Sequence, residues 1–215
     1  MKQPFDTLAN EYDSWYESPR GGNIFEAELK CLRRLCPDCR GRWLEVGVGT
    51  GRFASRMGIG EGLDPSPAML ALAAARGIKT YTGSAEELPF EADSFDGILI
   101  AFTLCFIAGS QKALAEAARV LKPGGRLLVG LVPAESPWGK HYQQKKENGH
   151  PIYSRADFLT VEKTVEMAEK GGFSLQKSAS ALFCPPRQAE LAADDVRPGI
   201  SKQAGFAAIM FVKPA

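Results

Sequence analysis

The sequence predicts an α/β fold in which a mostly parallel sheet of seven strands is covered by helices on both faces. Short apolar segments alternate with helical ones between residues 43 and 170, a pattern typical of parallel strands joined by crossover helices. The last two apolar segments, 173–183 and 205–212, have no helical pattern between them. We therefore expect these two to pair antiparallel, because a parallel pair would need a crossover.

A helical segment precedes the sheet. Residues 23–35 place Phe25, Leu29 and Leu32 at helical spacing, and Pro37 ends the segment. The 215 residues suffice for a single domain with one substantial core, so we expect one domain over residues 1–215.

The alternating region begins with an apolar strand that ends in glycines. Ser66 can cap the helix that follows the second strand, Pro67 suits its first turn, and Gly77 ends it. The KPGG turn at 122–125 stops a later helix. The predicted strands are 43–48, 62–64, 78–82, 95–102 and 126–132, and the predicted helices begin at Arg52 and span 66–76, 112–121 and 157–170.

Composition and charge argue against several classes of protein. A nucleic-acid-binding domain is normally strongly basic, whereas the net charge here is +1. The first ten residues are polar, and no apolar run approaches the roughly 20 residues of a membrane span. Five cysteines do not suggest a disulfide framework. We therefore expect a cytoplasmic protein with reduced thiols and with neither nucleic acid nor membrane as a partner.

Three of the cysteines lie close together in the sequence. Cys31, Cys36 and Cys39 have C-x₄-C-x₂-C spacing. A structural zinc site usually takes four ligands from paired motifs, and only one C-x-x-C is present. We predict no metal site and treat the thiols as small apolar side chains; a soft metalloid such as arsenite is the alternative ligand.

Residues 44–51 (LEVGVGTG) end one strand and open a helix, with glycines that let the backbone approach a ligand closely. Dinucleotide-binding enzymes carry G-x-G-x-x-G here, so the third glycine of this chain comes one position early. The acidic Glu45 would repel a pyrophosphate and attract a cation. S-adenosylmethionine (SAM) carries an ammonium and a sulfonium, so the loop favours SAM, and an NAD(P)-dependent oxidoreductase is the alternative.

Asp64 ends the second predicted strand. A carboxylate at this place can accept hydrogen bonds from both hydroxyls of a ribose. This supports an adenosine ligand but does not separate SAM from NAD. The alternative role is structural, because Asp64 and Ser66 both precede a helix that they can cap.

Four segments, taken in order, resemble the motifs of the class I SAM-dependent methyltransferases, in particular the type 11 methyltransferase domain. They are LEVGVGTGRFA (44–54), GLDPSPAML (62–70), GSAEELPFEADSFDGILIAF (83–102) and RVLKPGGRLLVG (119–130). The resemblance implies a Rossmann-like fold and methyl transfer from SAM, with S-adenosylhomocysteine as the product. The leading hypothesis is transfer to a small-molecule acceptor by direct displacement; the alternative is a non-catalytic SAM-binding sensor or partner subunit.

The resemblance also assigns roles to single residues. Glu45 and the loop glycines would hold the methionine end of SAM, and Asp64 the ribose. Where the family commonly has an acidic partner for adenine, this chain has Ser84, whose hydroxyl can still form a hydrogen bond. The predicted cofactor residues are Glu45, Gly47, Gly49, Gly51, Asp64, Pro65, Met69, Ser84, Ala85, Glu86, Ala101, Phe102, Thr103 and Tyr16.

Two segments are expected to lie over the acceptor. The first 40 residues resemble an N-terminal helical lid through their aromatic cluster, for which core packing is the alternative interpretation. The polar insertion 133–156 follows the carboxyl end of a strand, where open α/β sheets bind ligands. Its His141 is the candidate general base, with a surface histidine as the alternative. The predicted acceptor-site residues are Tyr12, Trp138, His141 and Tyr142.

Overall fold

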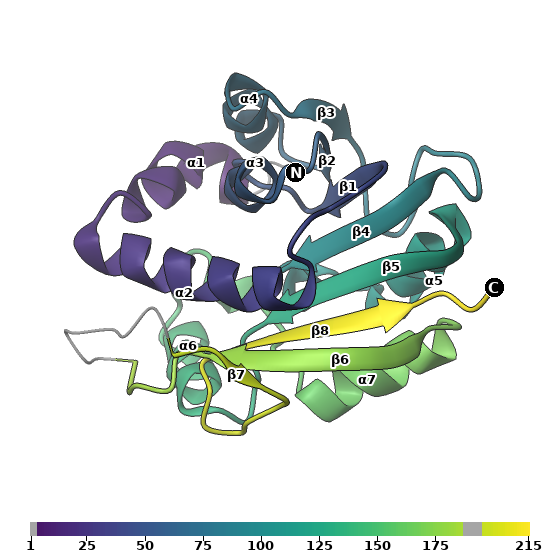
Figure 1. Ribbon diagram of the computed structural model, residues 1–215. Helices are drawn as coiled ribbons and strands as arrows, with labels where there is room; N and C mark the ends of the chain where they lie inside the picture. Colours follow the sequence, from purple (N-terminus) through teal and green to yellow (C-terminus); the bar gives the residue numbers. More distant parts are fainter. Residues whose placement is uncertain (1–3, 187–194) are drawn as a thin grey trace.

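The computed structural model describes residues 4–186 and 195–215, in which helices lie on both sides of one central sheet (Figure 1). The strands of this sheet are β1 (Trp43–Val46), β2 (Glu61–Asp64), β3 (Lys79–Thr82), β4 (Phe95–Ala101), β5 (Leu121–Leu131), β6 (Ser174–Ala181), β7 (Arg197–Pro198) and β8 (Phe206–Val212). Their order across the sheet is β3-β2-β1-β4-β5-β8-β6-β7. The pairs among β1 to β5 are all parallel, which confirms the predicted α/β fold.

The C-terminal strands pair antiparallel, as predicted. β8 lies between β5 and β6 and runs antiparallel to both, with Ile209 opposite Val129 on one side and Ser178 on the other. The sequence predicted seven strands, and the described residues contain an eighth, the two-residue β7 at the edge beside β6. A segment this short carries no periodic signal, so the sequence did not indicate it.

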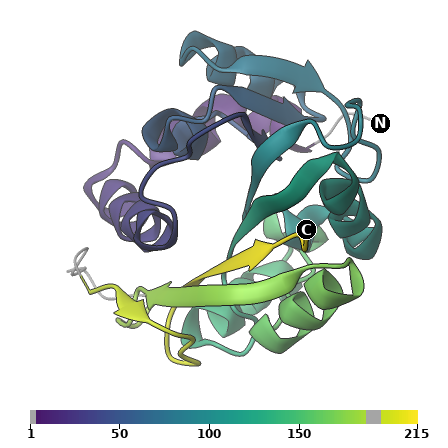
Figure 2. The same ribbon diagram turned by 45° about the vertical axis from the view of Figure 1, so that its right-hand side comes forward.

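Seven α-helices and two 3₁₀ turns surround the sheet in the described part of the chain. They are α1 (Pro4–Trp15), α2 (Pro19–Leu35), α3 (Arg52–Met57), α4 (Pro67–Ala75), α5 (Ser110–Val120), α6 (Pro137–Glu147), α7 (Val161–Lys170), η1 (Leu104–Phe106) and η2 (Tyr153–Arg155). Figure 2 shows α2 and α7 on opposite sides of the sheet. None of these helices is long and apolar enough to span a membrane.

The core has two halves because the central strands are buried on both faces. On β4, Leu99 packs with α2, α3 and α4, whereas Ile98 and Ile100 pack with α5 and α7. Successive side chains of a strand point to opposite faces, so a continuous apolar run such as β4 supplies both halves. Because both faces of these strands are packed, the positions of the strand ends are fixed, and so are the starting points of the loops that follow them.

Several boundaries differ from the sequence prediction, among them those of β5 and α7. The KPGG segment expected as a turn belongs to β5, where Gly124 has a φ of +75° and the register against β4 shifts. The helix predicted over 157–170 begins at Val161, because the Thr160 hydroxyl caps it by accepting from the Lys163 N–H at 3.0 Å. Local hydrogen bonds therefore set these boundaries.

The polar insertion 133–156 contains a helix, α6, which the sequence pattern did not reveal. The buried Ser136 hydroxyl caps it by accepting from the Gly139 N–H at 2.9 Å, and Pro137 occupies its first turn. α4 uses the same Ser-Pro start, with Ser66 as the cap. The insertion is thus ordered, and it consists of the helix α6 followed by the 3₁₀ turn η2.

Candidate active site

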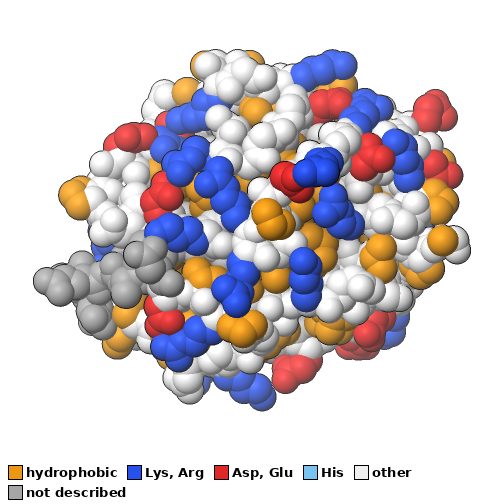
Figure 3. Space-filling view, in the orientation of Figure 1, with side chains coloured by type: hydrophobic (Ala, Val, Ile, Leu, Met, Phe, Trp, Pro, Cys, Tyr) orange, Lys and Arg blue, Asp and Glu red, His pale blue; other side chains and the backbone are white. Residues whose placement is uncertain are grey.

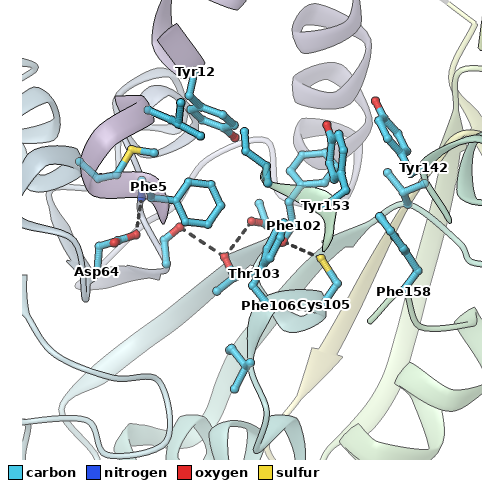
Figure 4. Close-up of a pocket in the computed structure, with 18 of the residues that line it drawn as sticks. Phe5, Tyr12, Asp64, Phe102, Thr103, Cys105, Phe106, Tyr142, Tyr153 and Phe158 are labelled. Carbon is cyan, nitrogen blue, oxygen red and sulfur yellow. Dashed lines mark hydrogen bonds between the residues drawn. The ribbon is translucent and has the colours of Figure 1, made fainter. Parts of the chain in front are cut away.

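One cavity of about 1010 Å³ lies at the carboxyl ends of the central parallel strands. Residues that follow β1, β2, β4 and β5 line its floor, and α1, α6 and η2 supply side chains from above (Figure 4). The carboxyl ends of parallel strands meet at one edge of a sheet, where ligands of open α/β folds bind. The cavity therefore lies where the sequence predicted a ligand.

The glycine loop forms one end of this cavity. Gly47 has a φ of +73°, and a Cβ there would lie 2.2 Å from the Thr103 side chain. Gly49 has a φ of +51° and lines the cavity, and a Cβ there would meet nothing within 4 Å. Gly51 packs against Ala73 behind the loop, away from the cavity lining. The loop thus leaves a bare backbone surface at Gly49 that a ligand can approach.

Asp64 ties the loop to the start of α4. Its carboxylate accepts from the Gly49 N–H at 2.9 Å and from the Ser66 N–H at 2.8 Å. Ser66, not Asp64, caps α4 by accepting from the Met69 N–H. Burial raises the pKa of Asp64, and these two backbone hydrogen bonds oppose the rise. A carboxylate has about four lone-pair sites, so two donors leave acceptor capacity that faces the cavity.

Glu45 lies behind the loop, buried and outside the cavity lining. Burial raises its pKa well above the ordinary range, and the Ala54 N–H opposes the rise. Within the described residues its Oε2 atom has no hydrogen-bond partner. The acid that faces the cavity at this end is Asp64, and a carboxylate there favours a cationic ligand over a pyrophosphate.

The segment after β3 forms the next part of the wall. The Ser84 hydroxyl donates to the Glu86 carboxylate and accepts from the Glu86 N–H. The Gly109 N–H donates to the other Glu86 oxygen at 3.4 Å. Burial raises the pKa of Glu86, but these hydrogen bonds outweigh it and leave the pKa below its usual value. Ser84, Ala85 and Glu86 all line the cavity.

A strained turn follows β4 at the cavity floor. Phe102 has a φ of +59°, a conformation that non-glycine residues seldom adopt and that clusters at functional sites. The Thr103 hydroxyl lies within hydrogen-bond distance of the Ala101 and Gly47 carbonyls at 3.0 and 3.3 Å, and the Cys105 thiol donates to the Phe102 carbonyl. These bonds hold the turn against the glycine loop (Figure 4).

α1 covers the glycine-loop end of the cavity. Asp13 binds Arg52 of α3 and Arg76 at the end of α4, each at 2.8 Å. The Tyr12 and Tyr16 hydroxyls lie 2.9 Å apart, and both residues line the cavity. The predicted aromatic cluster therefore forms a cavity wall that ion pairs fasten to the domain.

α6 and η2 form the opposite wall. Trp138 and Tyr142 line the cavity, and the Tyr142 ring lies 4.7 Å from that of Tyr153. His141, the predicted base, is not among the lining residues, whereas His150 is. Burial and the nearby Lys145 lower the pKa of His150. The histidine available to a ligand in this cavity is therefore His150.

The cavity thus collects most of the predicted site. All predicted cofactor residues except Glu45 and Gly51 line it, as do the predicted acceptor residues except His141. The sequence prediction missed Glu28, Tyr153 and Phe158, which also line it. One sequence feature could have indicated Glu28 as a site residue: it is an acid on the otherwise apolar stripe of α2, three positions after Phe25.

The cysteines do not converge on one point. The Cys36 and Cys39 sulfurs lie 3.7 Å apart, whereas Cys31 is a residue of α2 that is buried in the core. Within the described residues, no group of three or more His, Cys, Asp or Glu side chains is placed to hold a metal ion.

Comparison with known proteins adds family evidence. Residues 44–129 match a family model described as a methyltransferase domain. An uncharacterized protein of Methanocaldococcus jannaschii is 39% identical over 179 residues, which cover 83% of this chain and 85% of that protein. An uncharacterized protein of Mycobacterium tuberculosis is 37% identical over 207 residues, covering 96% and 73%.

A solved structure matches over almost the whole chain. It is a crystal structure from Thermotoga maritima, named "SAM-dependent methyltransferase, possible histamine N-methyltransferase". The two chains are 36% identical, each is covered to 98%, and the TM-score is 0.88.

Proposed function

This chain belongs to the SAM-dependent methyltransferases, and we propose that it transfers the methyl group of SAM to a small-molecule acceptor bound between α1 and α6. The observation that carries this proposal is the continuity of the cavity. One space joins the glycine loop and Asp64 to a chamber lined by Tyr142 and Tyr153. Cofactor and acceptor would then meet inside a single enclosure.

The residues at the glycine-loop end fit SAM. Asp64 keeps acceptor capacity toward the cavity, whereas Glu45 lies behind the loop, outside the cavity lining. The Asp64 carboxylate suits a ligand with a ribose diol, and its negative charge opposes a pyrophosphate. The bare Gly49 backbone lets such a ligand approach closely.

Bound SAM would supply an electrophilic methyl group on a sulfonium. The work of the chain is to orient the acceptor and to exclude water, and orientation alone contributes roughly 7–11 kcal/mol to such reactions. The strained Phe102–Thr103 turn lies where the two ligands would meet. His150 replaces His141 in this proposal as the histidine that can take a proton from an acceptor, because its lowered pKa keeps the imidazole neutral.

The size of the cavity supports a small acceptor. Ligand pockets in proteins commonly measure about 300–1,000 Å³, and the cavity is at the upper end, as the space for two small ligands requires. On the face that α2 occupies, Lys and Arg side chains are scattered among uncharged and acidic ones (Figure 3). The size of the cavity therefore suits two small ligands.

A methyl-acceptor screen tests the proposal. The purified chain would be incubated with SAM and small amines, thiols, phenols and metalloids, and S-adenosylhomocysteine would be measured. We expect turnover with one acceptor class, abolished in Asp64→Ala. Turnover confined to protein or RNA substrates would overturn the assignment of a small acceptor.

A further inference from the structure

Glu28 is a buried acid that the cofactor site does not use. It lies on the stripe of α2 that holds Ile24, Leu29 and Leu32 in the core, and the residue is 5% exposed. Its side chain lines the cavity. Within residues 4–186 and 195–215, its carboxyl forms neither a hydrogen bond nor an ion pair.

Four tyrosines line the same cavity as this acid. The charge of Glu28 acts on Tyr12, Tyr16, Tyr142 and Tyr153 and raises the pKa of each. The Tyr12 and Tyr16 ring centres lie 5.4 Å apart, and those of Tyr142 and Tyr153 lie 4.7 Å apart. Figure 4 shows Tyr12, Tyr153 and Tyr142 following one another along the cavity. We call Glu28 and these four tyrosines the tyrosine chamber.

An unpaired buried carboxylate is unfavourable, because moving a charged group from water into the protein interior costs free energy that burying an apolar side chain does not. Burial accordingly raises the pKa of Glu28 well above its ordinary value. A ligand that carries a positive charge removes this penalty by pairing with the carboxylate. Aromatic ring faces attract the same kind of ligand through cation–π interactions. The Glu28 carboxylate and the tyrosine rings thus both favour a ligand that carries a positive charge.

Glu28 belongs to a different element from the acids at the glycine loop, because it lies on α2 whereas Glu45 and Asp64 lie on β1 and β2. Glu28 influences neither Glu45 nor Asp64, and Tyr12 lies at the border between the two groups, because the charges of both Glu28 and Glu45 raise its pKa. Lys145 also lines the cavity, but it lies over the Tyr142 and Tyr153 rings, at 5.3 and 5.6 Å, and leaves Glu28 unpaired. Glu28, with Tyr142 and Tyr153 on the wall opposite the glycine loop, is therefore placed to bind the acceptor, and Tyr12 and Tyr16 lie where the acceptor would border the cofactor.

We propose that Glu28 and its four tyrosines bind a small cationic amine as the methyl acceptor. This inference rests on the proposed methyltransferase function. The carboxylate pairs with the ammonium. For an amine acceptor Glu28, rather than His150, takes the proton, and its passage from the nitrogen to a Glu28 oxygen leaves the nitrogen lone pair free. Glu28 thereby sets the specificity for an amine over a neutral molecule of the same shape.

The test compares wild-type protein with Glu28→Gln and with a matched control, Glu26→Gln. Glu26 lies on the same helix, its side chain is 37% exposed, and it pairs with Arg56 at 2.8 Å outside the cavity. Calorimetry in the presence of S-adenosylhomocysteine would measure binding of aliphatic and arylalkyl primary amines, each paired with the alcohol of the same carbon skeleton. Infrared spectra would follow the carbonyl band of a protonated carboxylic acid, with and without the amine.

We expect the wild-type protein and Glu26→Gln to bind an amine of the panel at least about tenfold more tightly than its alcohol, and Glu28→Gln to lose that preference. The protonated-acid band should weaken when the amine binds to the wild-type protein, and this amine-dependent change should be absent from Glu28→Gln. A structural role for Glu28 would instead lower the thermal midpoint of Glu28→Gln, which we expect to be unchanged or raised.

Three results would overturn the inference: amines binding no better than their alcohols, including no binding by either; an amine preference that survives in Glu28→Gln; or a loss of S-adenosylhomocysteine affinity in that variant. The last result would place Glu28 in the cofactor site. If the wild-type protein fails to bind S-adenosylhomocysteine at all, the proposed function itself fails, so the two failures are distinguishable.

Discussion

Replacing Asp13 by asparagine should detach α1 from the domain by removing one charge. The Asp13 carboxylate receives hydrogen bonds from Arg52 at 2.8 and 3.0 Å and from Arg76 at 2.8 Å. The side chains of these three residues are 15–26% exposed, so solvent screens the pairs less than surface ion pairs. Few other polar contacts fasten α1 above the glycine loop, among them the Asp6–Ser66 hydrogen bond.

The magnitude follows from the pKa of Asp13. Burial raises this pKa, but hydrogen bonds from Arg52, Thr50 and Arg76 outweigh burial and lower it from 3.8 to about 2. Each pKa unit corresponds to roughly 1.4 kcal/mol, so the network stabilises the folded state by about 2 kcal/mol at neutral pH. Because the folded-state pKa is depressed, this stabilisation is complete above the ordinary value and is lost as the pH falls toward 2.

Urea denaturation of wild-type protein and Asp13→Asn, from pH 7 down to pH 3, measures the effect. We expect a deficit of about 2 kcal/mol at pH 7 that shrinks at the acidic end, together with weaker S-adenosylhomocysteine binding. The control is Asp38→Asn, whose partner Arg40 is 85% exposed, and which should change stability by less than about 0.5 kcal/mol. A deficit that is absent at pH 7, or that does not vary with pH, refutes the reasoning.

Two further substitutions test the site, and a third tests the packing of the sheet that carries it. Asp64→Asn removes a charged acceptor and should weaken S-adenosylhomocysteine binding by about 10- to 100-fold in calorimetry; unchanged affinity would contradict the ribose role. Gly49→Val places a branched side chain at a φ of +51° on the cavity wall, and should abolish binding and lower stability by about 1–3 kcal/mol. Gly97→Ala would place a Cβ 2.1 Å from the Trp43 ring, so its free energy of unfolding in urea should fall by about 1–3 kcal/mol, whereas wild-type stability would show that the strand can shift.

Sequence patterns predicted the central sheet well because its signals are local. The Ser66-Pro67 start of α4 and the apolar run of β4 each lie within a few residues of the structure they specify. The same kind of signal, Ser136-Pro137, begins α6, but the polar composition around it concealed the helix. The two-residue β7 exists only because β6 offers an edge to pair with, which no local pattern encodes.

The residues of the candidate site also fall into two groups, those placed by the order of the strands and those placed by tertiary packing. Gly49, Asp64 and Ser84 follow consecutive strands of one parallel unit, so the fold alone brings them to one cavity. Glu28 and Tyr153 come from α2 and η2, which are more than a hundred residues apart, and only tertiary packing joins them. His141 and His150 lie on the same insertion, and the direction each takes depends on how α6 packs.

A crystal structure of the protein with S-adenosylhomocysteine tests the central claim most directly, namely that one cavity binds the cofactor at the glycine loop and the acceptor in the tyrosine chamber. We predict that the ribose hydroxyls donate to the Asp64 carboxylate and that the sulfur faces a chamber left open beside Glu28. S-adenosylhomocysteine bound away from Asp64, or filling the chamber around Glu28, would contradict the account.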